Sequence, residues 1–277
     1  MLTRKTIGFL GAGNLAEALI KGLIASGTVR PGQIVASDRM SERLVHIAKA
    51  YEIKVFSKNF EAARIADIIF LTVKPGDVDH VLREIAPDID AGKLLISAAA
   101  GVTTVRILDV LKGAGLAHFV SIVRAMPNTP AIVREAATGL SAGAGTGEKQ
   151  LELARALFEP IGKVAIIKDE ALMDAVTGLS GSGPAYVFLF MEALIDGGVR
   201  MGLPKETAKA LAMQTVLGAA KLAMESPKDL AELRKMVSSP GGTTIEGLKK
   251  LDEGGFTEVV ERAVEAATRR ARELSGK

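Results

Sequence analysis

The chain of 277 residues is 48% hydrophobic and 24% charged, a composition typical of a globular protein with a sizeable core. Its formal net charge of +3, from 35 basic and 32 acidic side chains, is too small to indicate a nucleic-acid partner. No Cys is present, which excludes disulfides, thiolate nucleophiles and Cys-zinc sites and is typical of a reducing cytoplasm.

Metal sites and membrane spans are not predicted either. His46, His80 and His118 are scattered without the spacing of metal ligands. No window approaches the run of about 18–20 apolar residues that spans a bilayer. The apolar stretch near the N-terminus resembles a signal peptide, but Glu17 and Lys21 interrupt it. We therefore expect a soluble cytoplasmic protein with no membrane partner.

Short apolar runs alternate with helical patterns over residues 1–167. Several runs are apolar on both faces, as in parallel strands that helices cover on each side. The predicted strands are Thr6–Leu10, Ile34–Ser37, Lys54–Phe56, Ile68–Val73, Leu94–Ser97, Phe119–Val123 and Val164–Ile167. The helical patterns between them are Leu15–Ala25, Ser41–Ala50, Val78–Ile85 and Val105–Leu111. This alternation predicts an α/β domain with a Rossmann-like doubly wound sheet.

Residues 168–277 contain only helical patterns. The predicted helices are Glu170–Leu179, Pro184–Met201, Pro204–Met224, Ala231–Val237, Thr244–Leu251 and Phe256–Leu274. The stretch "AYVFLFMEALI" is apolar on more than one face, so it must be covered, and a second subunit is the expected cover. These residues are predicted to form an all-α dimerisation domain.

A glycine-rich turn opens the chain. Gly11-Ala12-Gly13-Asn14-Leu15-Ala16 has the pattern G-x-G-x-x-A between a predicted strand and a predicted helix. Gly11 allows the tight turn, and Gly13 lets the backbone approach a pyrophosphate, which faces the NH groups of the helix start. In this βαβ context the pattern predicts a dinucleotide site.

The second strand should end beside the adenosine ribose, at Ser37-Asp38-Arg39. Asp38 would bind a free 2′-hydroxyl, as in NAD, whereas Ser37 and Arg39 would hold a 2′-phosphate, as in NADP. Asp38 could instead only cap the helix that begins near Ser41. Lys74-Pro75, after the fourth strand, should lie at the carboxyl edge of the sheet, although such a pair is often only a turn.

The segment "SSPGGTT" (238–244) interrupts the helical region. Gly241 and Gly242 let the backbone approach a ligand, and the following helix start presents free NH groups at its positive end. The pattern is typical of an anion site, but it also fits a helix start that Thr243 or Thr244 caps.

Three segments carry a resemblance to a known family. With "AMPNTP" (125–130), "TGLSGSGPAY" (177–186) and "SSPGGTTIEGL" (238–248), the sequence closely resembles the pyrroline-5-carboxylate reductases. These enzymes make proline by reducing a cyclic imine with a nicotinamide cofactor. The likeness extends from the glycine turn to about Glu273, with the motifs in matching order. Many members have a Pro in the segment where this chain reads "SPKDLAELRKMV", so the shape of the loop there is open.

The resemblance implies NADP(H) as cofactor, with NAD(H) as the alternative, and places Asn128 near the nicotinamide. It implies a homodimer or a ring of dimers with intertwined helical domains and an active site at their interface. The implied dinucleotide contacts are Leu10, Gly11, Ala12, Gly13, Asn14, Leu15, Ser37, Asp38, Arg39, Asn59, Thr72, Val73, Lys74, Pro75, Ala98, Ala99, Ala100 and Asn128.

The implied small-molecule substrate is a cyclic imino acid. We assign Ser239 and the backbone of Gly242, Thr243 and Thr244 to its carboxylate, with the Thr244 hydroxyl close to the ring nitrogen as the catalytic group. A protonated imine brings its own electrophilic charge, and the cofactor carries the difficult chemistry. The lack of an acid or base in the loop is therefore consistent with this reaction.

Two other functions compete with this interpretation. The β-hydroxyacid dehydrogenases also join a Rossmann domain to a helical domain, but they use a Lys on the first long helix, and residues 183–200 contain none. A non-catalytic NADP sensor would need the glycine turn but not "SSPGGTT".

Overall fold

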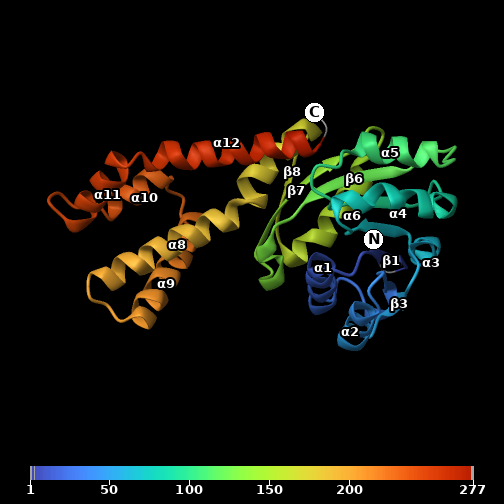
Figure 1. The fold of residues 1–277 in the computed structure, drawn as a ribbon, viewed down its shortest axis with the longest axis horizontal. Coiled ribbons are helices and arrows are strands. Elements are labelled where there is room, and N and C mark those ends of the chain that lie inside the picture. Colours follow the sequence, from blue (N-terminus) through green and yellow to red (C-terminus); the bar gives the residue numbers. More distant parts are fainter. Residues whose placement is uncertain (1, 3, 276–277) are drawn as a thin grey trace. The chain divides into compact units, whose positions relative to one another are not determined.

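The computed structural model describes residue 2 and residues 4–275. Residues 7–166 include a sheet of eight strands in the order β3-β2-β1-β4-β5-β6-β7-β8, and several of these strands are labelled in Figure 1. The strands are β1 (Ile7–Leu10), β2 (Ile34–Ser37), β3 (Lys54–Phe56), β4 (Ile68–Leu71), β5 (Leu94–Ser97), β6 (Ser121–Met126), β7 (Ala136–Ala142) and β8 (Gly162–Ile166). All seven predicted strands are present, and β7 was not predicted.

The sheet is doubly wound, as expected. Strands β1 to β6 run parallel, with β1 between β2 and β4. The chain order reverses at β1 and β4, which creates the crevice at the carboxyl ends of the strands where such folds bind ligands. The parallel expectation fails at β7, which pairs antiparallel with β6, while β8 runs parallel to β7. Small residues and a Gly in "AATGLSA" hide β7 from a search for apolar β-branched runs.

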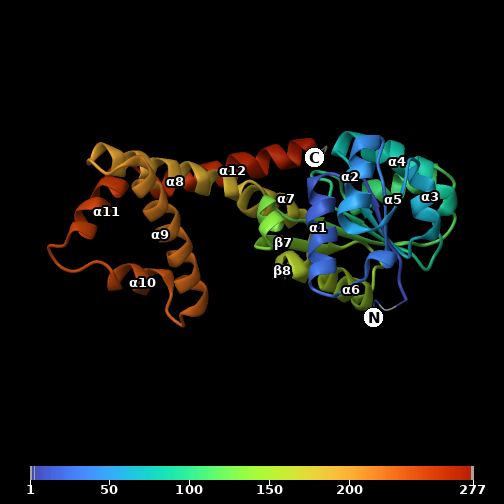
Figure 2. The same ribbon diagram turned by 90° about the horizontal axis from the view of Figure 1, so that it is seen from below.

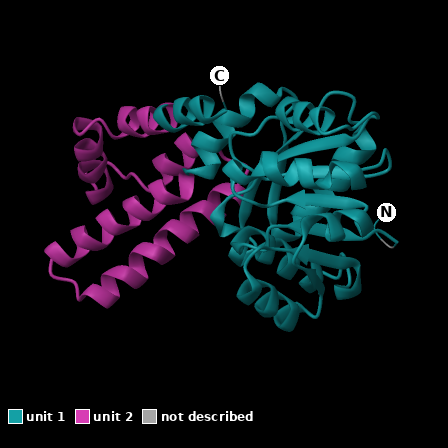
Figure 3. Ribbon diagram, turned by 45° about the vertical axis from the view of Figure 1, so that its right-hand side comes forward, with its two compact units in different colours: residues 1–182, 266–277 teal, residues 183–265 magenta. Residues whose placement is uncertain are grey.

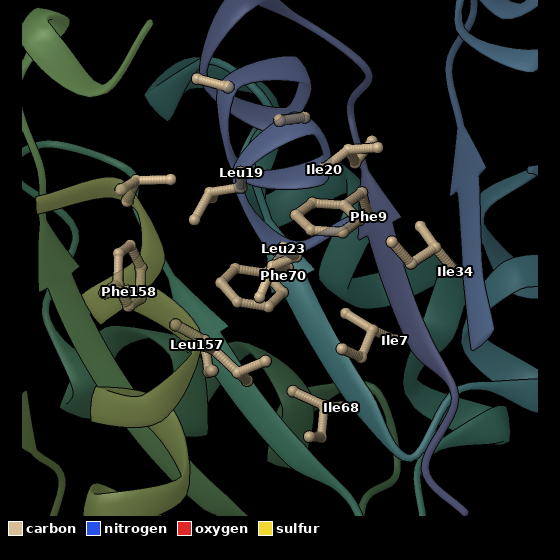
Figure 4. Close-up of a cluster of buried hydrophobic side chains, with 14 of the residues drawn as sticks. Ile7, Phe9, Leu19, Ile20, Leu23, Ile34, Ile68, Phe70, Leu157 and Phe158 are labelled. Carbon is tan, nitrogen blue, oxygen red and sulfur yellow. The ribbon is translucent and has the colours of Figure 1, made fainter. Parts of the chain in front are cut away.

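Helices cover both faces of this sheet. On one face, apolar side chains of α1, α2 and α6 belong to one buried core with Phe9 and Phe70, whose stacked rings have centroids 4.7 Å apart; Figure 4 shows the part of this core around α1 and α6. On the other face, α3, α4 and α5 form a second core. These helices are α1 (Asn14–Ala25), α2 (Ser41–Tyr51), α3 (Asn59–Ile65), α4 (Val78–Ile85), α5 (Thr104–Gly113) and α6 (Glu148–Phe158). Helices α3 and α6 were not predicted from the sequence.

The remaining elements are almost entirely helical, as predicted from residue 168 onward. They are the 3-10 turn η6 (Glu170–Leu172), α7 (Met173–Val176), the π-helix η7 (Thr177–Gly181), α8 (Gly183–Arg200), α9 (Lys205–Glu225), α10 (Leu230–Met236), α11 (Thr243–Glu253) and α12 (Phe256–Leu274). Two compact units result: residues 1–182 with 266–277, and residues 183–265 (Figure 3). The boundary predicted after residue 167 lies earlier in the chain than the observed boundary after residue 182.

A buried ion pair explains why the residues just after 167 belong to the unit that contains the sheet. Arg124, in the middle of β6, has only 2% of its side chain exposed, and its guanidinium lies 3.1 Å from a carboxylate oxygen of Asp174 on α7. Glu170 approaches the same guanidinium at 3.6 Å and accepts hydrogen bonds from the backbone and hydroxyl of Thr104. Ser275, after α12, donates to Asp174 at 3.3 Å. Residues at both ends of the helical region are therefore fixed to the sheet.

The second unit has almost no core of its own. Among its described residues only Ala208 and Ala212 are buried, and α8 contributes no buried side chain. Large apolar residues of α8 lie on the surface, including Phe188 at 57% and Leu189 at 68% exposure. Burial of such a surface is strongly favourable, so this unit requires a partner.

The prediction that no segment is apolar enough to span a membrane is wrong. The helical stretch Glu170–Arg200, 31 residues long, is apolar enough to cross a membrane by length and composition, contrary to the sequence prediction. One such stretch among the described residues is weak evidence, because the core helix of a soluble protein passes the same test. This stretch includes α8, and a second subunit is the expected cover for the exposed apolar side chains of that helix.

We expect Arg124→Met to lower the free energy of unfolding by about 3–5 kcal/mol, because it leaves Asp174 charged and buried. Arg155→Met is the matched control, since Arg155 is 44% exposed and its ion pairs with Glu152 and Glu159 lie on the surface. Urea denaturation followed by circular dichroism measures both. Equal midpoints for the two variants would show that the buried pair is not a structural anchor.

Candidate active site

The glycine turn lies at the point where the chain order of the sheet reverses. Gly11 has φ +95°, and a Cβ placed there would lie 2.8 Å from the nitrogen of Val73, on the turn after β4. Thr72 adds a hydrogen bond to this contact, because its hydroxyl donates to the Gly11 carbonyl at 2.7 Å. Only Gly satisfies both constraints, so the turn between β1 and α1 is held tightly against the turn after β4.

Gly13, unlike the crowded Gly11, borders open space. A Cβ at this position would meet no atom within 4 Å, so the space beside the turn is open. Gly13 is the N-cap of α1, and no side chain of the described residues caps this helix start. The NH groups of Asn14 and Leu15 therefore remain available at the positive end of the helix. This open, uncapped helix start fits the pyrophosphate of a dinucleotide.

Asp38 is bound into the glycine turn. One of its carboxylate oxygens accepts from the Ala12 backbone at 2.8 Å, and the other accepts from the Met40 backbone at 2.9 Å. The alternative that Asp38 caps α2 is wrong, because Met40 is the N-cap of that helix and α2 has no side-chain cap. Asp38 instead links the end of β2 to the turn after β1.

Ser37 and Asn59, both predicted to contact the dinucleotide, contact each other. The Ser37 hydroxyl is buried and donates to the Asn59 side-chain oxygen at 2.8 Å. Asn59 in turn donates its side-chain amide to Glu84 at 2.7 Å and its backbone NH to the same carboxylate at 2.9 Å. The three side chains join the end of β2 and the start of α3 to α4.

Glu17 organises a polar cluster that the sequence did not reveal. Its carboxylate accepts from Arg43, Tyr51 and the ring of His46, and Arg43 also donates to the Ala12 carbonyl in the glycine turn. Burial raises the pKa of Glu17, but these hydrogen bonds outweigh it and leave the pKa below its ordinary value. Burial and the Glu17 carboxylate raise the pKa of Tyr51 to about 12. No motif links these residues, which tertiary folding alone brings together.

Four predicted cofactor residues line one cavity of about 360 Å³ in the first unit. They are Asn14, Leu15, Ala98 and Asn128. The other lining residues were not assigned to the site from the sequence, although four of them lie in the segments "AMPNTP" and "TGLSGSGPAY"; they are Ala18, Met126, Pro127, Thr129, Ala131, Ile132 and Gly181. The cavity connects the start of α1 with the ends of β5 and β6, which is the carboxyl edge of the sheet.

Asn128 is fixed by hydrogen bonds at this cavity. Its amide donates to the Ser180 carbonyl at 3.0 Å, and its side-chain oxygen accepts from the Ala137 backbone at 3.0 Å. Ser180 belongs to the π-helix η7, a rare conformation that is frequent at functional sites. "TGLSG" thus does more than start α8, because it also supplies part of the cavity wall through Gly181.

The other predicted cofactor residues lie along the same edge. Leu10 ends β1, and Val73, Lys74 and Pro75 form the turn after β4. Ala99 and Ala100 follow β5, and the Ala98 backbone donates to the Leu71 carbonyl at 3.1 Å. Arg39 is exposed after β2. The fold therefore gathers all these segments at the carboxyl ends of neighbouring strands.

The "SSPGGTT" turn joins α10 to α11 in the second unit (Figure 2). Gly241 has φ +70°, and Gly242 packs so closely on Ser239 that a Cβ there would lie 2.6 Å from the Ser239 hydroxyl. The prediction that Thr243 or Thr244 caps the helix is wrong, because the N-cap is Gly242 and it has no side-chain cap. Both Thr residues lie inside the first turn of α11, where the NH groups lack side-chain caps from the described part of the chain.

A doubly wound sheet with a glycine turn at its switch point defines this chain as a dinucleotide-binding oxidoreductase of the Rossmann class. The pyrroline-5-carboxylate reductase of Arabidopsis thaliana is 42% identical, over 97% of this chain and 95% of its own length. The chain belongs to the pyrroline-5-carboxylate reductase family.

Family models and solved structures agree with this membership. Residues 170–274 match a model described as pyrroline-5-carboxylate reductase dimerisation, and residues 6–101 match one described as NADP oxidoreductase coenzyme F420-dependent. The reductase from Coxiella burnetii has a TM-score of 0.91 and 40% identity, covering 98% of both chains. The Plasmodium falciparum enzyme, solved with NADP bound, has a TM-score of 0.87 and 31% identity, covering 99% of this chain and 100% of its own.

Gly13→Val should separate binding from folding. The added side chain points into open space, so the midpoint of thermal unfolding should stay within about 2 °C of the wild type. NADP⁺ affinity should fall at least about a hundredfold, since the side chain blocks the approach to the helix NH groups.

Isothermal titration calorimetry with NADP⁺ measures the affinity, and Gly32→Val is the control, because a Cβ at Gly32 also meets no atom within 4 Å. Unchanged NADP⁺ binding by Gly13→Val would show that the glycine turn is not part of the NADP⁺ site.

Proposed function

We propose that this protein reduces 1-pyrroline-5-carboxylate to L-proline by hydride transfer from NADPH, the last step of proline synthesis, with NADH as the alternative donor. The observation that carries the proposal is the uncapped start of α11, reached through "SSPGGTT". This anion site lies in a chain whose other unit has a dinucleotide turn. Together they supply a place for a small carboxylate and a place for the reductant.

The carboxylate site uses backbone groups more than side chains. The helix α11 has eleven residues, so its first turn presents free NH groups at a positive dipole end. Gly242 leaves no Cβ over these groups, and the Ser239 hydroxyl lies beside it. We assign Ser239, Gly242, Thr243 and Thr244 to the substrate carboxylate, with the Thr244 hydroxyl directed to the ring nitrogen.

No acid or base from the protein is required for this reduction. When bound, NADPH supplies a hydride, which the imine carbon accepts while the ring nitrogen keeps its proton. The chain contributes position, since holding the imine at reaction distance can supply roughly 7–11 kcal/mol in favourable cases. Thr244 polarises the ring nitrogen and orients the ring. Asn128 and the cavity it lines provide the place for the nicotinamide.

The two alternative functions are less well supported. Oxidation of a hydroxyacid requires a general base, and α8, the first long helix after the Rossmann sheet, contains no Lys. A non-catalytic NADP sensor would have no use for the anion site at α11. Family membership along nearly the whole chain also favours the reductase.

We further propose a homodimer, or a ring of such dimers, whose active sites combine the dinucleotide turn of one subunit with α11 of its partner. The uncovered apolar residues of α8 and the match to a dimerisation model support self-association. The cysteine-free composition supports a cytoplasmic location. The net charge of +3 supports neither a nucleic-acid nor a membrane partner.

The activity is tested by following the absorbance of NADPH with 1-pyrroline-5-carboxylate as substrate and identifying proline by mass spectrometry. NADPH oxidation that depends on the imine and yields proline is the expected result. Binding of NADP⁺ without any oxidation would favour the sensor, and turnover of a hydroxyacid would favour the dehydrogenase.

Thr244→Ala should lower kcat by about a hundredfold, as expected when one preorganised hydrogen-bonding group is lost from a reaction centre. The affinity for NADP⁺ should not change. Thr257→Ala is the matched control, because Thr257 is an exposed Thr at the second position of another helix, α12. Steady-state kinetics and calorimetry give both quantities, and wild-type turnover in Thr244→Ala would contradict the assignment.

A further inference from the structure

We propose that Arg43 is a positioning residue of the dinucleotide site: by holding the Ala12 carbonyl it turns the Gly13 NH toward the pyrophosphate of the cofactor, and Glu17 keeps Arg43 in that position. The inference rests on the proposed function, because it concerns the cofactor site of the same enzyme. It assigns a role to the polar cluster around Glu17, which no sequence motif indicates.

Ala12, in the middle of the glycine turn, is fully buried. A buried backbone NH or carbonyl needs a hydrogen-bond partner from the protein, because water does not reach it. Side chains that follow β2 supply both partners. Asp38 accepts from the Ala12 NH at 2.8 Å, and the Nε of Arg43, on α2, donates to the Ala12 carbonyl. The middle of the turn is therefore held through its NH and through its carbonyl.

Gly13, the next residue, is exposed, and its NH donates to no group among the described residues. The peptide bond between Ala12 and Gly13 is trans, so the Ala12 carbonyl and the Gly13 NH lie in one plane and point in opposite directions. The contact with Arg43 on one side therefore fixes the direction of the Gly13 NH on the other. This NH joins those of Asn14 and Leu15 at the uncapped start of α1.

Glu17 holds the guanidinium of Arg43 in place. The Nη2 of Arg43 donates to its carboxylate, and both side chains are largely buried, with 22% of Arg43 and 24% of Glu17 exposed. Burial raises the pKa of Glu17, but the side-chain hydrogen bonds that it accepts lower this pKa below its ordinary value. Glu17 lies in the first turn of α1, where its backbone NH donates to the Gly13 carbonyl at 3.0 Å. The ion pair therefore joins α2 to the helix that starts at the glycine turn.

The two contacts of Arg43 require the shape of an arginine side chain. Nε and Nη2 are separate donors in one rigid plane, so a single guanidinium reaches a carbonyl and a carboxylate at once. A Lys ammonium is one point charge on a flexible chain, and it pairs with a charged carboxylate in preference to a neutral carbonyl. Replacement of Arg43 by Lys should therefore keep the ion pair with Glu17 and release the Ala12 carbonyl.

The test compares NADP⁺ affinity with thermal stability in variants of the full-length protein. Titration calorimetry with NADP⁺ measures the affinity separately from catalysis, and scanning calorimetry measures the midpoint of unfolding. Arg43→Met should weaken NADP⁺ binding by about tenfold, because one directed NH is lost, and lower the midpoint by about 3 °C, because the ion pair is lost. Arg43→Lys should weaken NADP⁺ binding by at least about fivefold but keep the midpoint within about 1 °C of the wild type.

Two further variants complete the experiment. Glu17→Gln should weaken NADP⁺ binding by about threefold, because a neutral amide holds the guanidinium less firmly than a carboxylate does. Arg64→Met is the control: Arg64 also joins two segments, since it donates to Asp88 at 2.8 Å, but it lies near the end of α3, just before β4 begins at the amino edge of the sheet. It should not change NADP⁺ affinity.

Wild-type affinity in Arg43→Lys would show that the ion pair only stabilises the fold and would overturn the proposal, as would unchanged affinity in Arg43→Met. Tighter NADP⁺ binding in Glu17→Gln would show that Arg43, once released, binds a phosphate itself, which also overturns it. Failure of the wild type to bind NADP⁺ would overturn the cofactor site together with the role of Arg43. If NADP⁺ binding changes as expected but no imine is reduced, the proposed function fails and the assignment of Arg43 stands.

Discussion

A positive charge buried inside the sheet holds the two ends of the helical region in place. Arg124 is surrounded by strands on a central part of the sheet, where an unpaired charge would be very unfavourable. Asp174, near the start of the helical region, pairs with this charge, and Ser275, after the last helix, donates its hydroxyl to Asp174. The chain between Asp174 and Ser275 therefore leaves the sheet-containing unit and returns to it at the same place. The π-helix that supports Asn128 begins three residues after Asp174, so the cavity wall depends on the same anchor.

The helices between these ends cannot form a stable structure by themselves. A unit of this size with two buried Ala residues has too little core to offset the conformational entropy lost on folding. Its exposed Phe and Leu side chains require another apolar surface, and a dimerisation model matches this part of the chain. In the proposed enzyme the same need for a partner also completes the catalytic centre, because the substrate turn before α11 belongs to this unit. Folding, assembly and activity are then linked.

The sequence predicted the fold well wherever a strand is apolar on both faces or a helix has a clear apolar side. It failed at β7, whose Ala, Thr, Gly and Ser residues become a strand only through pairing with β6 and β8. It located the glycine turn, the carboxyl edge of the sheet and the "SSPGGTT" turn, since each is a local pattern with a physical reason. It did not predict the roles of side chains whose partners are distant in the chain. The contact of Asp38 with Ala12 and that of Asn59 with Glu84 join residues about 25 positions apart. No rule based on sequence spacing predicts such contacts.

The central claim is that each active site takes its dinucleotide turn from one subunit and its substrate turn from another. Mixing two strongly impaired variants tests this claim most directly: Gly13→Val has a damaged dinucleotide turn, and Thr244→Ala lacks the catalytic hydroxyl. Equal amounts are unfolded together, refolded and assayed for reduction of 1-pyrroline-5-carboxylate. If the turns combine between subunits, half of the dimers are mixed and each has one intact site, so about a quarter of wild-type activity should return. If both turns of a site belong to one subunit, no intact site can form, and a mixture as inactive as its components would contradict the account.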